Sequence, residues 1–199
     1  MDWVTFETEF TAGLDEFTQN AVAANPADSV YCVAIYMFYT DYTQVLLPMF
    51  SAATAGWLSS MDDDDREASR WHPPDYPIQQ EGDFDNPNAF YRRACDWLTA
   101  EARAADPDSV QRDKNAGCDA VVDRANAVIA RAARVVMDQI RSEGTVQGGL
   151  LVLPLDENWD PQLDLVRRVL SEAELQAHPT LLEYLVEAQA ASSADPASS

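Results

Sequence analysis

Hydrophobic residues recur with helical spacing over the first 24 positions of the chain. They are Trp3, Phe6, Phe10, Leu14 and Phe17. Acidic residues fall mostly between them, Asp2 suits a helix N-cap, and Asn25-Pro26 would end a helix. The pattern therefore predicts an amphipathic helix over residues 3–24, with its aromatic stripe packed in a core.

The pattern then changes to one typical of strands. Val30 to Phe38 is an apolar run rich in β-branched and aromatic residues, which predicts a buried strand. We expect Thr43 to Phe50 to be its hairpin partner, with Pro48 at a sheet edge or at the strand end, because proline cannot donate to a ladder. A short helix is predicted over Thr54 to Met61, and a charged connector over Asp62 to Arg70.

The middle of the chain is punctuated by proline. The segment Trp71–Pro77 contains three prolines, so we predict that it is extended and not helical, and that a polar loop follows as far as Asp85. Asn86-Pro87 is a suitable cap and first turn for a helix that runs to about Ala105. A long amphipathic helix is predicted from about Cys118 to Ser142, with Gly144 as its end.

The last part of the chain predicts one more strand and short helices. Leu150 to Leu155 reads as a third strand, and Pro161 to Leu170 as a helix. Ser171 and Thr180 each begin a capping-box sequence, which predicts a helix start at both positions. Residues 190–199 are Ala, Ser, Asp and Pro, and we expect a disordered tail there.

These elements predict an α+β fold with a single domain over residues 1–189. The sheet is expected to be small and mostly antiparallel, with about three or more strands, and to be covered by the first helix and the long helix. The residues expected in the core are Phe6, Phe10, Val33, Ile35, Val128, Ile129 and Val136.

The charge of the chain is strongly negative and unevenly distributed. The formal net charge is −21, all 13 Lys and Arg residues lie at or beyond Arg66, and residues 1–65 hold 11 acidic residues and no base. Direct binding to nucleic acid and to anionic membranes is therefore not expected, because both need a basic face. The acidity either reflects a proteome-wide bias or steers a basic protein partner to an acidic surface.

The candidate partner-binding residues combine acids with an aromatic segment. Trp71 and Tyr76 either dock a partner or pin a long crossing segment onto the core, and both readings stay open. The candidates are Glu9, Asp15, Glu16, Asp62, Asp63, Asp64, Asp65, Trp71, Asp75 and Tyr76.

No motif for a metal, cofactor or catalytic site stands out, so we predict no cofactor and no metal. His72 and His178 lack a second His or Cys at zinc spacing, and G-x-S-x-G does not occur. The three cysteines are odd in number and widely spaced, which favours buried free thiols in a reducing cytoplasm. The chain begins without a basic region of the signal-peptide type and has no apolar run of membrane-spanning length, so we expect a cytoplasmic location.

Several features occur in an order that resembles a bacterial family, domain of unknown function 4303. They are the strand Val30–Tyr36, Leu47-Pro48 running into Ala53-Thr54, Trp71-x-Pro73, the Ala-rich helix ending near Gly144, the aliphatic strand into Asp156, and His178-Pro179. Family members often keep a second tryptophan after the Trp-x-Pro element, where this chain has Tyr76. The resemblance implies no established activity. By analogy it points to immunity and antitoxin-associated proteins of bacterial conflict systems.

The functional hypothesis is a non-catalytic acidic binding protein that masks or regulates a basic protein partner, in an immunity-like role by that analogy. One alternative is a small enzyme whose site residues are scattered along the chain. Another is a housekeeping domain whose acidity only reflects its proteome.

Overall fold

The computed structural model describes residues 1–36, 39–41, 44–81, 89–105, 116–144, 149–155 and 162–194. The helical elements are α1 (Trp3–Ala24), α2 (Ala55–Ser59), α3 (Asp63–Ser69), the 3-10 turn η1 (Pro73–Asp75), α4 (Phe90–Ala105), α6 (Ala116–Glu143), α7 (Gln162–Val169), α8 (Glu172–Gln176) and α9 (Pro179–Ala194). The strands are β1 (Val30–Tyr36), β2 (Tyr39–Asp41), β3 (Gln44–Leu46), β4 (Met49–Thr54), β5 (Ile78–Gln79) and β6 (Leu151–Pro154).

Within these residues, a four-stranded sheet has the order β5-β4-β1-β6. β1 pairs antiparallel with β4, and β4 pairs antiparallel with β5. β6 pairs parallel with β1, so the sheet is mixed, with antiparallel pairing predominant. The α+β class and the small, mostly antiparallel sheet are confirmed.

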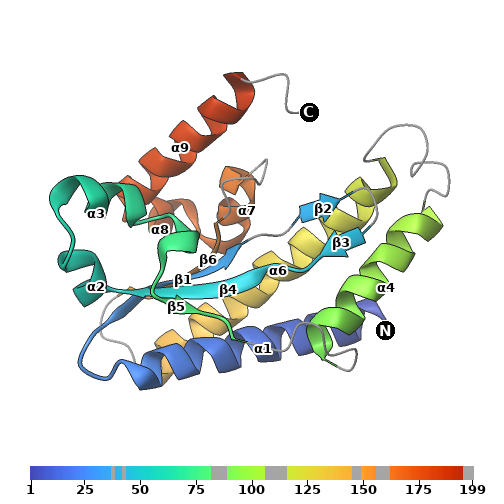
Figure 1. Ribbon diagram of the computed structural model, residues 1–199, viewed down its shortest axis with the longest axis horizontal. Coiled ribbons are helices and arrows are strands. Elements are labelled where there is room, and N and C mark those ends of the chain that lie inside the picture. Colours follow the sequence, from blue (N-terminus) through green and yellow to red (C-terminus); the bar gives the residue numbers. More distant parts are fainter. Residues whose placement is uncertain are drawn as a thin grey trace.

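One face of the sheet packs against α1 and α6, which also contact each other. In Figure 1, α1 runs below the sheet and α6 crosses diagonally behind it. Phe50 of β4 pairs with Ile35 of β1, so both side chains are on this face, and the Phe50 ring lies 5.5 Å from that of Phe10 and 5.8 Å from that of Phe17. The turn η1 packs against β1 and β4, and α7 packs on β6. Each of the seven residues expected in the core is buried.

Several local predictions are confirmed at the level of hydrogen bonds. The Asp2 carboxylate accepts the N–H of Thr5 at 2.7 Å, which caps α1, and α1 ends before Asn25. Gly144 has φ of 65° and follows the end of α6, as a glycine C-cap requires. Ser171 forms both hydrogen bonds of a capping box at the start of α8.

The predicted hairpin is right only at the end of its second strand, where Met49 and Phe50 pair antiparallel with β1, and wrong for the residues before them. β1 pairs with β4, whereas the chain between them folds into a separate ribbon of β2 and β3. Thr43 lies outside the described residues, and Pro48 falls between β3 and β4, where no ladder needs its N–H.

Residues 62–70 are not an irregular connector, because α3 begins at Asp63. The Asp62 carboxylate caps this helix by accepting the N–H of Asp65 at 3.0 Å, and three more carboxylates fill the first turn. Acids in that position interact favourably with the positive end of the helix dipole. The charge run that suggested a solvated connector is therefore a helix-start signal.

The extended segment and the tail also need correction. Pro73–Asp75 forms a single 3-10 turn, which tolerates proline because its first N–H groups need no partner, and the short strand β5 follows it where a loop was expected. α9 begins at Pro179, so Thr180 lies inside the helix and is not its cap. α9 also continues to Ala194, so residues 190–194 are helical, while 195–199, Asn86-Pro87 and the Cys118 side chain lie outside what the structure describes.

No helix of the described residues is long and apolar enough to cross a membrane.

Candidate functional site

The predicted acidic residues lie on two separate elements. Asp62 to Asp65 begin α3, whereas Glu9, Asp15 and Glu16 belong to α1. Figure 1 shows α3 and α1 apart, with α2 and the sheet between them. These acids therefore do not join into one surface, and the two groups have to be considered one at a time.

The acids of α3 are used locally. Asp62 caps the helix, and Asp63 forms an ion pair of 2.8 Å with Arg66. Both contacts are within the first turns of the same element and in open solvent. They account for the side chains of Asp62 and Asp63 without a partner.

Two of the three α1 acids have partners. Glu9 lies 2.5 Å from the guanidinium of Arg93 on α4, and Asp15 accepts hydrogen bonds from Gln19 one turn later. Glu16 is exposed and makes no hydrogen bond or ion pair with another described residue. Arg131 of α6 neutralises the neighbouring Glu7, and not the predicted acids.

Trp71 and Tyr76 pack against β1, as the structural reading of their segment expects. Trp71 is 5% exposed and Tyr76 is 2% exposed. Both rings stand edge-on to Tyr31, and the hydroxyls of Tyr31 and Tyr76 both donate to the carbonyl of Arg70 at 2.8 Å. Burial raises the pKa of both tyrosines, so they remain neutral donors. The segment pins the crossing chain onto β1.

A groove of about 410 Å³ lies between α1, α4 and the start of β4. Its apolar lining is supplied by Phe10, Ala12, Gly13, Leu47, Pro48, Phe50, Ala89, Phe90 and Tyr91, and its polar lining by Glu9, Glu16 and Gln80. We call this feature the acid-rimmed groove. It contains two of the predicted partner-binding residues, Glu9 and Glu16, and joins them to an apolar floor.

Hydrogen bonds hold the walls of the acid-rimmed groove in place. The Tyr91 hydroxyl donates to the carbonyl of Leu47 at 3.1 Å, and the N–H of Leu47 donates to the sulfur of Cys95 at 3.3 Å, so α4 is fixed to the chain before β4. The N–H of Phe50 donates to Oε1 of Gln80 at 3.1 Å. The groove is thus a preformed feature of three connected elements.

Gly13 makes the groove open on the α1 side. A Cβ at this position would meet no atom within 4 Å, so the missing side chain leaves space. Glycine in the interior of a helix costs about 0.5–1 kcal/mol relative to alanine. A glycine inside the helix at position 13 is a sequence signal that could have drawn attention to this site, but the sequence analysis did not use it. Periodicity alone assigned the phenylalanines of the groove to the core.

An arrangement of three described residues resembles catalytic chemistry. The Ser69 hydroxyl donates to Oδ2 of Asp75 at 3.2 Å, and Nδ1 of His72 lies 3.0 Å from the same oxygen. A serine nucleophile needs the histidine between it and the carboxylate. Here the carboxylate is in the middle, so His72 cannot take the Ser69 proton through this arrangement, and Asp75 acts as a local brace.

The thiols that the structure describes are not activated. Cys32 and Cys95 are buried and free, as predicted. Burial raises the pKa of Cys32 to about 12 and also raises that of Cys95, so both are protonated at neutral pH. Over the described ranges, no group of three His, Cys, Asp or Glu residues is placed to hold a metal ion.

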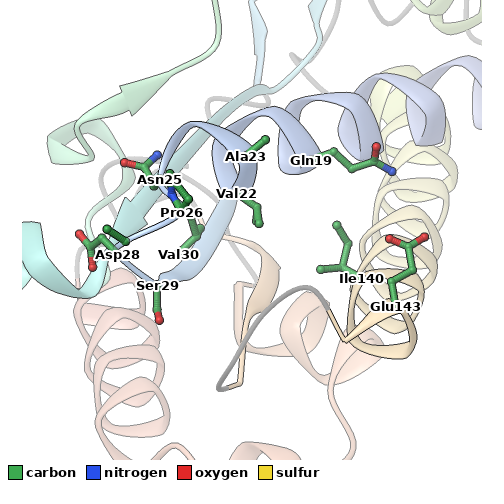
Figure 2. Close-up of a pocket in the computed structure, with 11 residues that line it drawn as sticks. Gln19, Val22, Ala23, Asn25, Pro26, Asp28, Ser29, Val30, Ile140 and Glu143 are labelled. Atoms are coloured by element: carbon green, nitrogen blue, oxygen red, sulfur yellow. The ribbon is translucent and has the colours of Figure 1, made fainter.

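Another cleft, of about 700 Å³, lies between the end of α1 and the end of α6. Figure 2 shows Asp28 on the side away from Ile140 and Glu143, so the acids do not converge. Asp28 is occupied: the Thr54 side chain and the N–H of Gly56, at 2.8 Å, bond to its carboxylate and lower its pKa. This residue joins the start of β1 to α2, so its carboxylate is already used within the fold.

Comparison of the chain with protein-family models, curated proteins and solved structures finds no match.

Proposed function

We propose that this protein is a non-catalytic binding protein that holds a basic protein partner on the acid-rimmed groove. The observation that carries the proposal is the combination of an apolar floor with Glu9 and Glu16 on its rim. A basic side chain of the partner would pair with Glu16, which has no partner among the described residues, while an aromatic or branched aliphatic side chain fills the floor beside Phe10 and Phe50.

The net charge of −21 supports the same class of partner. A field of one sign raises the association rate of an oppositely charged protein and repels acidic ones, and this effect weakens as salt increases. An immunity-like role, in which the partner is a basic toxin that is masked while bound, is the form of the proposal that the family resemblance favours. The acids of α3 would contribute to the long-range field and not to the contact.

The test uses an array of synthetic peptides that each combine Lys or Arg with one aromatic or branched aliphatic residue. Binding is measured by fluorescence polarisation for the wild-type chain and for Gly13→Leu, whose side chain would project into the groove. Gly13→Ala is the matched control, because its methyl group meets open space. We expect selected peptides to bind the wild type and Gly13→Ala, and to bind Gly13→Leu at least about tenfold more weakly.

A second variant tests the charge on the rim. Glu16→Gln should weaken the same peptides and reduce the salt dependence of their binding, because it removes the exposed carboxylate without changing the floor. Peptides that bind Gly13→Leu as tightly as the wild type, or a failure of the whole array to bind, would overturn the groove as the site.

A further inference from the structure

A different cavity lies between α3 and the beginning of α9, at the end of the molecule away from α4 (Figure 1). Its volume is about 640 Å³. Arg66, Arg70 and His178 are among the described residues that line it, and none of these lining residues is Asp or Glu. The chain has 34 acidic and 13 basic residues, so most of its surface is expected to carry carboxylates. A cavity lined by two arginines and no carboxylate departs from that expectation.

Arg70 supplies the unneutralised charge of this cavity. The hydroxyls of Tyr31 and Tyr76 both bond to its carbonyl oxygen, which fixes the backbone from which the side chain extends. The guanidinium group of Arg70 has no hydrogen bond or ion pair with another described residue. Arg66, in contrast, donates to two backbone carbonyls and to Asp63, so three of its five N–H donors are in use and its charge is paired.

Trp71 adds a buried donor without an acceptor. The residue lines the cavity and is 5% exposed, and its indole N–H has no hydrogen-bond partner among the described residues. An unpaired buried donor costs about 1–3 kcal/mol. The indole nitrogen itself has almost no surface open to solvent, so an acceptor bound in the cavity would remove this cost only with a shift of the Trp71 ring toward the cavity.

The start of α9 forms the opposite wall. This 16-residue helix begins at Pro179, and His178, Pro179 and Thr180 all line the cavity. Pro179 has no N–H, and the N–H groups of Leu181 and Leu182 bond to the carbonyl of His178. This wall therefore offers an anion the N–H of Thr180 and the positive end of the helix dipole. Burial and the nearby Arg141 lower the pKa of His178, with Glu174 opposing them, so at neutral pH His178 offers a hydrogen-bonding ring and not a charge.

We propose that this cavity binds a small organic anion. Its carboxylate or phosphate group would contact Arg70, the Trp71 indole N–H and the start of α9, and its apolar part would lie against Leu58 and Leu151, which also line the cavity. The volume is within the range of about 300–1,000 Å³ that is usual for small-molecule sites. This site shares no residue with the acid-rimmed groove and does not depend on the function proposed for it.

The test is a nuclear magnetic resonance titration of the full chain with benzoate, phenyl phosphate and neutral benzamide as probes. The readout is the indole N–H signal of Trp71, one of five tryptophans, assigned by its loss in Trp71→Phe. We expect benzoate, phenyl phosphate or both to shift this signal saturably to lower field, as a new hydrogen bond does, and benzamide to leave it unchanged. The two anions distinguish a carboxylate ligand from a phosphate ligand.

Two arginine variants identify the origin of the binding. Arg70→Gln keeps the carbonyl that the two tyrosines bind and removes only the charge, so the protein should fold and its dissociation constant for the anion should rise about tenfold or more. Arg168→Gln makes the same charge change at an exposed position of α7 and should leave binding unchanged. Equal binding to wild type and Arg70→Gln, or no shift by either anion up to about 10 mM, would overturn the proposal.

Discussion

Glu174 shows how a single carboxylate connects two elements. It accepts hydrogen bonds from Arg134 at 2.8 Å and Arg141 at 2.9 Å, both on α6, and it also completes the capping box with Ser171. Desolvation opposes its ionisation, but the bonds from Ser171, Arg134 and Arg141 prevail and lower the pKa of Glu174 to about 2. The side chain thus fastens α8 to the long helix.

The prediction at this scale concerns Glu174→Gln. The pKa of Glu174 is lower in the folded state than its value of 4.5 in the unfolded chain. Its ionised carboxylate therefore stabilises the fold at pH values above 4.5, and this stabilisation is lost as the pH falls toward 2. At pH 7 the variant should therefore lose about 1–3 kcal/mol of unfolding free energy, after allowance for partial exposure. Urea unfolding at several pH values measures this, and the difference from wild type should shrink as the pH falls from 5 to 3.

The control for this prediction is Glu172→Gln in the same helix. Glu172 is exposed and contacts only Gln176, at 3.4 Å, among the described residues, so its replacement should cost less than about 0.5 kcal/mol. Equal losses for the two variants would show that the arginine contacts of Glu174 contribute nothing.

At the scale of elements, the helices could be predicted because their signals are local. The aromatic stripe and Asp2 placed α1, and Gly144 placed the end of α6. Strand pairing could not be predicted in the same way, because it joins residues far apart in the chain. β5 is only two residues long, and Ile78-Gln79 has no sequence pattern that would predict the pairing of Gln79 with Ser51.

Gly13 in α1 and Gly144 after α6 allow a prediction about how backbone conformation decides the effect of an alanine substitution. A Cβ at Gly13 or at Gly144 would meet no atom within 4 Å, but only Gly144 has positive φ, at 65°. Gly13→Ala should therefore stabilise the protein by about 0.5–1 kcal/mol through better helix propensity, and Gly144→Ala should destabilise it by about 1 kcal/mol. Thermal unfolding of both variants checks the opposite signs, and a shared sign would mean that backbone conformation does not decide the outcome.

At the scale of the whole molecule, the sequence predicted the amount of charge but not its arrangement. Composition gave the net charge, and the absence of bases before Arg66 suggested one acidic surface. The fold separates those acids onto α1 and α3, and it brings Glu9 and Glu16 beside Phe50 and Phe90. Such a groove depends on tertiary packing of α1, α4 and β4, so no local pattern could reveal its floor.

The charge imbalance predicts that salt stabilises the fold. Even if each of the 13 bases paired with one acid, 21 of the 34 acids would remain without a base and would repel one another. Screening weakens this repulsion more than it weakens the ion pairs, so the melting temperature should rise between about 20 and 500 mM salt. Calorimetry in NaCl and KCl should give the same rise, whereas a fall, or a response to one cation only, would show that repulsion does not dominate.

The parallel pairing of β1 with β6 has a consequence for how the protein is made. Cys32 of β1 pairs with Leu151 of β6, and β1 is an inner strand of the sheet. During synthesis β1 is therefore complete long before its neighbour β6 exists. Contacts between such distant residues raise contact order and slow folding. Until residue 154 has left the ribosome, the nascent chain presents the apolar edge of β1, and an exposed edge of this kind invites aggregation. Protection of the growing chain by a chaperone would matter most during that interval.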